Sequence, residues 1–420
     1  MACLKATPTK IICTLGPKSD SEETIKELVT QGMDIARVNF SHGDLDYHQR
    51  IFAILNRIRN DPQYATLAVA VDTKGPEIRT GMFVSGKATI QQGSCVRLST
   101  ETKYQDCGTA EVFYIDHQGI FKDLAAMPAK SIFIDDGKLE LVIESINAEQ
   151  QEIVTRAANS YEISSRKGVN IPGTDISLPN LTDKDRQDIQ FGIDNGADFI
   201  FASFVRTKEC LAEIRALANS DQIKIIAKIE SEEGIKNLKE IVEASDGIMI
   251  ARGDLGIEVP YSRLFALQCS ISQLCRELNK PFIVATQMLE STTQSLRPTR
   301  AEITDVGFAT ATGAACVMLS GETAAGICPP NSVKIMKNIL VATAEDLLKT
   351  NSTSPIFPIP NSQPEITMVS SNNLKFLRHT QLFYAQVPVY SSKESPTATP
   401  TVPQGYAQQL KQDSANKPQL

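Results

Sequence analysis

The stretch from Lys224 to Glu230 reads KIIAKIE, and the stretch from Gly247 to Asp254 reads GIMIARGD. Each is a short apolar run that ends in charged residues. Runs of this length, rich in isoleucine, are typical of strands buried on both faces of a parallel sheet. The two stretches therefore predict neighbouring buried strands that deliver polar side chains to one edge of a sheet.

Six more apolar runs share this pattern, and a helical pattern follows each of the eight. We predict strands at Lys10–Leu15, Ile35–Phe40, Leu67–Asp72, Phe199–Phe204, Lys224–Ile229, Gly247–Ala251, Pro281–Thr286 and Cys316–Leu319. Two helix starts carry a capping box, in a loose form at Asp20 with Glu23 and in the standard form at Thr299 with Glu302. Eight strand–helix units predict a closed (β/α)₈ TIM barrel of the α/β class.

The pattern breaks between the third and fourth strands, where apolar and polar residues alternate with period two. We interpret residues 76–172 as an inserted all-β lid domain, which splits the catalytic barrel into residues 1–75 and 173–349. Residues 350–420 hold 9 of the 21 prolines and many polar residues. We expect this low-complexity tail to be disordered, because it has too little apolar surface to offset the entropy of ordering.

The composition excludes several classes of protein. No apolar run approaches the roughly 18 to 20 residues of a membrane helix, and no secretory signal is present. The net charge of −7 speaks against non-specific nucleic-acid binding. The nine cysteines form no C-x-x-C pair, so we expect neither a disulfide framework nor a structural zinc site. We predict a cytoplasmic protein with buried reduced thiols, and no membrane or nucleic-acid partner.

Polar residues follow the predicted strands, where barrel enzymes carry their catalytic groups. Lys228 and Glu230 are two apart on one strand, so they project from the same face. Glu230 and Asp254, on adjacent strands, have the oxygen ligands that Mg²⁺ prefers, and Lys228 is suited to neutralising a phosphoryl group. A structural salt bridge is the alternative for this pair. The polar residues at the other strand ends favour a metal-dependent phosphoryl-transfer site.

Other strand-end residues have functional or structural interpretations. The amides of Gly253 to Gly256 are suited to a carboxylate, or form an ordinary glycine turn. Arg37 is suited to a phosphate, whereas His42 reads by default as a surface histidine. An oxygen-rich group suits a monovalent cation or forms a hydrogen-bond network at the barrel mouth; its members are Asn39, Ser41, Asp72 and Thr73.

Seven strings of this sequence resemble the pyruvate kinase family. They are Lys10–Pro17 (KIICTLGP), Asp72–Arg79 (DTKGPEIR), Ala227–Glu230 (AKIE), Ile250–Gly256 (IARGDLG), Ala285–Glu290 (ATQMLE), Arg297–Glu302 (RPTRAE) and Met318–Thr323 (MLSGET). The resemblance runs from Lys10 to about Leu348. It implies transfer of the phosphoryl group of phosphoenolpyruvate to ADP, followed by protonation of the enolate to give pyruvate in glycolysis.

The resemblance also implies a role for each matching residue. Lys228 stabilises the transferring phosphoryl group, Arg37 contacts the substrate phosphate, and Thr286 belongs to the site that delivers the proton. Glu230 and Asp254 hold Mg²⁺ or Mn²⁺, while the amides of Gly253 and Asp254 receive the substrate carboxylate. The K⁺ ligands are Asn39, Ser41, Asp72 and Thr73, and Glu77 matches the glutamate of K⁺-dependent members. The nucleotide contacts are Asn39, His42, Arg79 and Lys167, and Asp136 approaches the site when the lid closes.

This sequence departs from the family pattern in three places. The family continues past the barrel into an α/β domain with an allosteric sugar-phosphate site, which we expect to be absent here. Gly307 lies in a predicted helix where the family has alanine, and Cys328 stands where an aromatic residue is usual. We therefore expect an active pyruvate kinase without sugar-phosphate activation, and at most a homodimer through barrel helices. The alternative is a non-catalytic truncated isoform that binds ligands or full-length subunits.

Overall fold

The computed structural model describes residues 9–220 and 222–349 of the chain. The expectation for the tail, residues 350–420, lies outside the described residues. Contacts divide the chain into two compact units, the first with residues up to 37, 49–69 and from 288 onward, and the second with residues 38–48 and 70–287. No helix among the described residues is long and apolar enough to cross a membrane.

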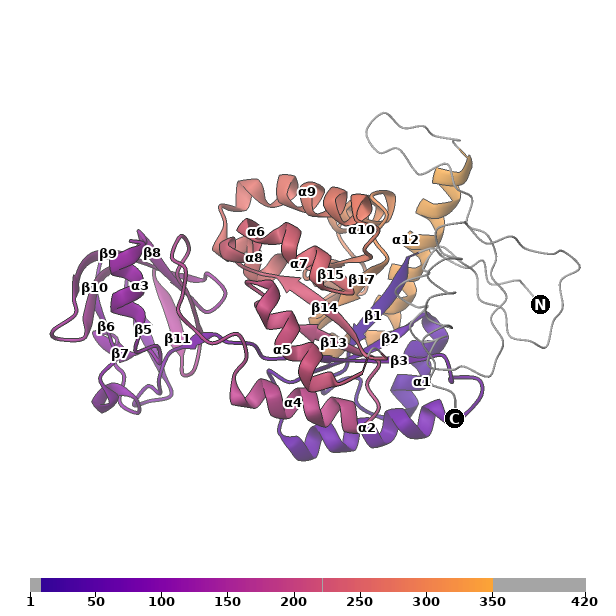
Figure 1. Ribbon diagram of the computed structural model, residues 1–420, viewed down its shortest axis with the longest axis horizontal. Helices are drawn as coiled ribbons and strands as arrows, with labels where there is room; N and C mark the ends of the chain where they lie inside the picture. Colours follow the sequence, from indigo (N-terminus) through magenta and orange to yellow (C-terminus); the bar gives the residue numbers. More distant parts are fainter. Residues whose placement is uncertain (1–8, 221, 350–420) are drawn as a thin grey trace, which may run out of the picture. The chain divides into compact units, whose positions relative to one another are not determined.

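Eight strands form a closed barrel in the order β1-β17-β16-β15-β14-β13-β3-β2 (Figure 1). Their bounds are β1 Lys10–Thr14, β2 Ile35–Asn39, β3 Ala68–Asp72, β13 Phe199–Ala202, β14 Lys224–Ile229, β15 Gly247–Ala251, β16 Phe282–Ala285 and β17 Cys316–Leu319. The strand pairs with a described register are parallel. The predicted (β/α)₈ barrel is confirmed, and every predicted strand is present.

Two predicted strands are one or two residues too long for a conformational reason. Phe204 and Thr286 were placed inside strands, but their φ angles are +52° and +76°. Positive φ lies outside the β region and is unusual for an aromatic or β-branched residue. The strands β13 and β16 therefore end at Ala202 and Ala285, and of the two irregular residues only Thr286 was a predicted site residue.

Helices follow the barrel strands. Their bounds are α1 Glu22–Gln31, α2 Leu45–Arg59, α4 Asp183–Asp194, α5 Lys208–Ala218, α6 Glu232–Lys236, α7 Leu238–Ala244, α8 Arg252–Glu258, α9 Leu264–Glu277, α10 Arg300–Ala311, α11 Gly321–Ala324 and α12 Pro329–Lys349, with 3₁₀ turns η2 Tyr261–Arg263 and η3 Glu290–Thr293. The capping box of Thr299 and Glu302 is confirmed. The one at Asp20 is wrong, because Ser21 caps α1 and accepts a hydrogen bond from the Thr24 amide.

Separate sheets lie between β3 and α4. A seven-stranded sheet has the order β4-β12-β8-β9-β10-β6-β7, and β11 pairs with β5. The bounds are β4 Ile78–Arg79, β5 Lys87–Ile90, β6 Cys95–Ser99, β7 Val112–Tyr114, β8 Ser131–Ile134, β9 Leu139–Asn147, β10 Glu152–Ala157, β11 Tyr161–Ser164 and β12 Gly168–Asn170. We call this part the sheet domain. It is not purely β, because it includes the helix α3 Ile120–Ala126 and the 3₁₀ turn η1 Thr102–Tyr104.

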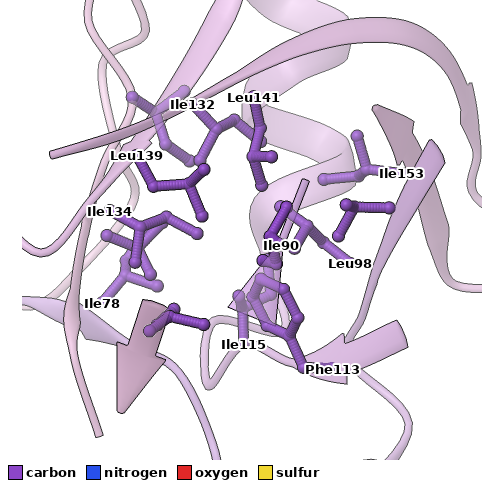
Figure 2. Packing of buried hydrophobic residues seen from close by; sticks show 14 of the residues in the cluster. Ile78, Ile90, Leu98, Phe113, Ile115, Ile132, Ile134, Leu139, Leu141 and Ile153 are labelled. Carbon is purple, nitrogen blue, oxygen red and sulfur yellow. The ribbon is translucent and has the colours of Figure 1, made fainter. Parts of the chain in front are cut away.

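The sheet domain has its own apolar core. Figure 2 shows isoleucine and leucine side chains from several of its strands converging, among them Ile90, Leu98 and Ile132, all fully buried. Alternation along each strand explains this core, because inward and outward side chains alternate with period two. In β8, Ile132 and Ile134 are buried while Ser131 and Phe133 are more exposed.

The cysteines only partly match the expectation. All eight cysteines among the described residues are free thiols. The expectation that they are buried is wrong for Cys95 and Cys107, which are exposed. Cys95 begins β6, where its side chain lies on the outward face of an alternating strand.

Candidate active site

The Lys228 side chain is buried at the end of β14, with 7 % of the residue exposed. Its ammonium nitrogen lies 3.1 Å from Asp72 Oδ1, 3.1 Å from Glu230 Oε1 and 2.7 Å from the Ser203 hydroxyl. A buried ammonium group is costly unless anions and hydrogen-bond acceptors compensate it. Two carboxylates and a hydroxyl do so here, so the lysine is held as a fixed cation.

Strand register explains how these groups meet. β13 and β14 pair in parallel with Ala202 opposite Ala227, so the next residues along the two strands are Ser203 and Lys228. β3 pairs with β13 so that Asp72 is opposite Phe201. The parallel register thus aligns the C-terminal ends of three neighbouring strands. The prediction that strand-end side chains come together is confirmed for this group.

Glu230 follows β14, and only 1 % of it is exposed. Its second carboxylate oxygen accepts a hydrogen bond of 2.7 Å from the backbone amide of Phe204. Phe204 has a positive φ and lies two residues after the end of β13 at Ala202. The carboxylate is therefore held between a cation on one oxygen and an amide on the other.

Asp254 lies in the first turn of α8, directly after β15, which pairs with β14. Burial, followed by the negative charge of Glu230, raises the pKa of Asp254 well above its ordinary value. Charge on Asp136 and Glu77 of the sheet domain acts in the same direction. Within the described part of the chain, no group of three or more His, Cys, Asp or Glu side chains is arranged so that it could hold a metal ion. Glu230 and Asp254 are thus a pair of acidic groups whose repulsion a cation would relieve.

The start of α8 packs against the end of β16. A Cβ atom at Gly253 would lie 2.9 Å from Thr286 Cγ2, so a larger residue at this position requires a shift. The guanidinium group of Arg252 donates a hydrogen bond of 2.7 Å to the Thr286 carbonyl. Thr286 keeps a φ of +76°, a strained conformation that clusters at functional sites. In the described residues no side chain caps the N-terminus of α8.

The candidate cation ligands lie at the ends of β2 and β3, or one or two residues beyond; they are Asn39, Ser41, Asp72 and Thr73. The Phe40 amide donates to the Asp72 carbonyl at 3.0 Å, which joins the two strand ends. Asn39 Oδ1 accepts from the Ser41 amide at 3.1 Å, and Thr73 Oγ1 accepts from the Ser203 amide at 3.0 Å. His42, next in the chain, is exposed. The interpretation as a hydrogen-bond network therefore has direct contacts in its favour, and the same oxygens remain the candidate cation ligands.

Two basic residues of the sheet domain lie on paired segments. Arg79 is opposite Gly168 across β4 and β12, directly beside Lys167. Arg79 donates to Glu77 at 2.7 Å and to the Arg166 carbonyl at 2.7 Å. The ammonium group of Lys167 lies 3.1 Å from Asp135 Oδ1. Both cations are thus oriented by neighbours in the sheet domain.

Arg37 belongs to the first compact unit, whereas the site residues described above belong to the second. It lies on β2 with 8 % of the residue exposed, and its guanidinium group donates a hydrogen bond of 2.8 Å to the Thr14 hydroxyl. The Thr14 hydroxyl in turn donates to the Leu319 carbonyl at 2.9 Å. Contacts across three barrel strands therefore fix the arginine.

Sequence reasoning missed two contributors to the site. Ser203 was inside a predicted strand and was not singled out, although a polar residue directly after the buried run FIFA is a usable signal. The Ser203 hydroxyl donates a hydrogen bond of 2.5 Å to the Thr73 carbonyl and accepts a hydrogen bond from Lys228. The Phe204 amide has no sequence signal, because a backbone donor is common to nearly every residue.

Comparisons with known proteins agree with this geometry. Residues 6–333 match the family model described as pyruvate kinase, barrel domain. The chain is 44% identical to a pyruvate kinase of Leishmania mexicana over 87% of this chain and 73% of the relative. It is 42% identical to pyruvate kinase 1 of Trypanosoma brucei brucei over 87% and 74%. For a pyruvate kinase of Agaricus bisporus the identity is 47%, over 78% and 62%. By this match over most of its length, the chain belongs to the pyruvate kinase family.

Proposed function

We propose that this chain is a pyruvate kinase, which transfers the phosphoryl group of phosphoenolpyruvate to ADP and gives pyruvate and ATP. The observation that carries the proposal is the buried Lys228 ammonium group, which Asp72, Glu230 and Ser203 hold at the strand ends of a barrel from this family. The comparisons favour this catalytic function over a ligand-binding isoform, because the similar proteins are named pyruvate kinases.

Lys228 acts on the phosphoryl group during transfer. Negative charge on the equatorial oxygens must be stabilised between the leaving enolate oxygen and the attacking phosphate of ADP. A cation that is already fixed stabilises this charge without reorganisation, and burial strengthens the interaction. Arg37 contributes a planar guanidinium group, the donor geometry that suits a phosphate.

The residues present fit a divalent cation. Glu230 and Asp254 supply carboxylate oxygens, and burial together with their mutual repulsion makes an adjacent cation favourable. Mg²⁺ commonly binds one or two carboxylates and completes its shell with water and substrate phosphates. We assign Mg²⁺ or Mn²⁺ to this pair, where the ion supplies charge stabilisation of phosphoryl oxygens.

The junction of α8 and β16 supports the remaining steps. The backbone amides of Gly253 and Asp254 are assigned to the substrate carboxylate, as in the family. Thr286 is assigned to the group that protonates the enolate carbon after the phosphoryl group has left. The close packing of Thr286 on Gly253 couples the carboxylate position to the proton donor.

K⁺ and the nucleotide are assigned to the two remaining groups. K⁺ requires hard oxygen ligands, and the ends of β2 and β3 offer amide, hydroxyl, carboxylate and carbonyl oxygens. These oxygens belong to Asn39, Ser41, Asp72 and Thr73. Glu77 orients Arg79. Arg79 and Lys167 carry the positive charge for the nucleotide phosphates, with Asn39 and His42 as further contacts.

We further propose that residues 76–172 act as a lid on a catalytic barrel formed by residues 1–75 and 173–349, with Asp136 approaching the site on closure. A homodimer through barrel helices is supported by two exposed apolar side chains, Tyr261 in η2 with 86% exposed and Phe265 at the start of α9 with 66% exposed. A cytoplasmic location is supported by the free thiols, which suit a reducing compartment.

The function is tested by phosphorus-31 NMR of the purified chain with phosphoenolpyruvate, ADP, Mg²⁺ and K⁺. We expect the phosphoenolpyruvate signal to be replaced by the γ-phosphate signal of ATP, and chelation of Mg²⁺ to stop the exchange. Replacing K⁺ with Na⁺ tests the monovalent site separately, and light scattering tests the dimer. A phosphoenolpyruvate signal that persists in the complete mixture would contradict the proposal.

A further inference from the structure

Two short segments connect the sheet domain to the barrel. The first follows β3, where the Gly75 amide donates to Asp185 Oδ1 at 2.9 Å. A Cβ atom at Gly75 would lie 2.8 Å from Ser203 Cβ, so only glycine fits this approach. The second segment runs from Gly173 to Pro179, between β12 and α4, and we call it the exit linker. It has no regular secondary structure, so side chains must fix it.

Arg206 holds the exit linker from the barrel side. Its guanidinium group donates hydrogen bonds to three backbone carbonyls of the linker. The acceptors are Ile176, Leu178 (2.5 Å) and Pro179 (3.0 Å). Only 12% of the Arg206 side chain is exposed. Three hydrogen bonds from one planar cation define the path of a segment far more strictly than one flexible contact.

The sheet domain holds the same linker from its own side. The Ser177 amide donates to Asp123 Oδ2 at 3.0 Å, and the Thr174 hydroxyl donates to the Met127 carbonyl at 2.8 Å. Asp123 is buried and also lies 2.6 Å from His117 Nε2. The linker is therefore bonded to α3 and the residue that follows it at positions 174 and 177, and to Arg206 at 176, 178 and 179.

The residues just before Arg206 belong to the phosphoryl site. Ser203 accepts a hydrogen bond from Lys228 at 2.7 Å, and the Phe204 amide donates to Glu230 at 2.7 Å. The Arg206 carbonyl accepts from Asn237 Nδ2 at 2.9 Å, which fixes the end of this segment. Four consecutive residues, Ser203 to Arg206, thus contact the lysine, the metal-ligand candidate and the exit linker.

We infer that Arg206 is a positioning residue that sets the orientation in which the sheet domain closes over the phosphoryl site. This inference rests on the proposed function. Because closure of a domain over a site often limits turnover, a loosened linker reduces the fraction of ternary complexes that reach the closed state. The hydrogen bonds of the Arg206 guanidinium group go to carbonyls of the linker, and none goes to Glu230, Asp254 or Lys228. Its effect on the site therefore passes through the linker.

The test compares Arg206→Met with Arg215→Met in the full chain. Arg215 is a matched control on α5, where its guanidinium group donates to the Ile223 carbonyl at 2.8 Å and to Asp246, before β14 and β15 begin. Hydrogen exchange by mass spectrometry reports the amides of residues 174–178. We expect Arg206→Met to exchange there at least tenfold faster than wild type, and Arg215→Met to match wild type.

Turnover gives the second readout. We expect kcat per folded molecule to fall at least tenfold in Arg206→Met and to stay within twofold of wild type in Arg215→Met. Arg206→Lys keeps the charge but loses the fork, so we expect intermediate values for both readouts; it also carries the test if the methionine variant does not fold. Unchanged linker exchange, or a kcat equal to that of the control, would overturn the inference. Absence of turnover in wild type would instead contradict the proposed function, while the exchange result would stand independently.

Discussion

Replacing Ser203 with alanine removes a neutral hydroxyl group that contacts the Lys228 ammonium group. The lost contact is a hydrogen bond of 2.7 Å to a charged donor with little solvent access. Hydrogen bonds to charged groups contribute about 1.5–3 kcal/mol. If the fixed position of Lys228 matters mainly in the transition state, this energy corresponds to a loss in kcat of roughly tenfold to 150-fold.

The same change affects folding. The Thr73 carbonyl loses a donor at 2.5 Å in a buried position, which costs about 1–3 kcal/mol of stability. Ser272→Ala is the matched control, because the buried Ser272 hydroxyl donates a hydrogen bond of 2.7 Å to the Gln268 carbonyl within α9. The assay couples pyruvate formation to lactate dehydrogenase, with urea unfolding in parallel. A kcat for Ser203→Ala within twofold of wild type, alongside a stability loss like that of the control, would refute the reasoning.

Three further predictions follow from single positions. Gly307→Ala should stabilise the chain by about 0.5–1 kcal/mol in urea unfolding, since Gly307 lies inside α10 and a Cβ there meets only Thr343 Oγ1 at 3.5 Å; a loss of stability would contradict this. Gly253→Ala should raise the KM for phosphoenolpyruvate roughly tenfold, because the new Cβ displaces Thr286; an unchanged KM would count against that packing. Burial raises the pKa of Glu258 from 4.5 to about 7, so the folded state binds its proton more tightly and this residue makes stability fall between about pH 4.5 and 7. Glu258→Gln should therefore gain stability relative to wild type as the pH rises from 5 to 7.5, and an equal pH slope in both proteins would rule this out.

The barrel was predictable because its signal is local. Buried parallel strands produce continuous apolar runs, and all eight runs became strands. The exact strand ends were not predictable at Phe204 and Thr286, because tertiary contacts impose their positive φ angles and the residue types argue against them. The cap of α1 was misplaced by one residue, since aspartate and serine are equally good caps and stand side by side at Asp20 and Ser21.

The candidate site divides in the same way. Lys228 and Glu230 were predictable from spacing on one strand, and their 3.1 Å contact agrees with it. Ser203 depends on the register of two strands, which sequence alone did not specify. The role of Arg206 rests on carbonyl groups of a segment with no secondary structure, and carbonyls carry no sequence signal. Groups fixed by spacing along one strand were therefore predictable, and contacts set by strand register or by the carbonyls of an irregular segment were not.

The central claim is that the fixed cation at the end of β14 performs phosphoryl transfer. The most direct measurement is the lactate-dehydrogenase-coupled assay with phosphoenolpyruvate, ADP, Mg²⁺ and K⁺, run on wild type and on Lys228→Met, with folding of both checked by circular dichroism. We predict clear turnover by wild type and a loss of at least a thousandfold in the folded variant, since the removed charge acts in a buried site. Turnover of folded Lys228→Met within tenfold of wild type, or none above background in wild type, would contradict the account.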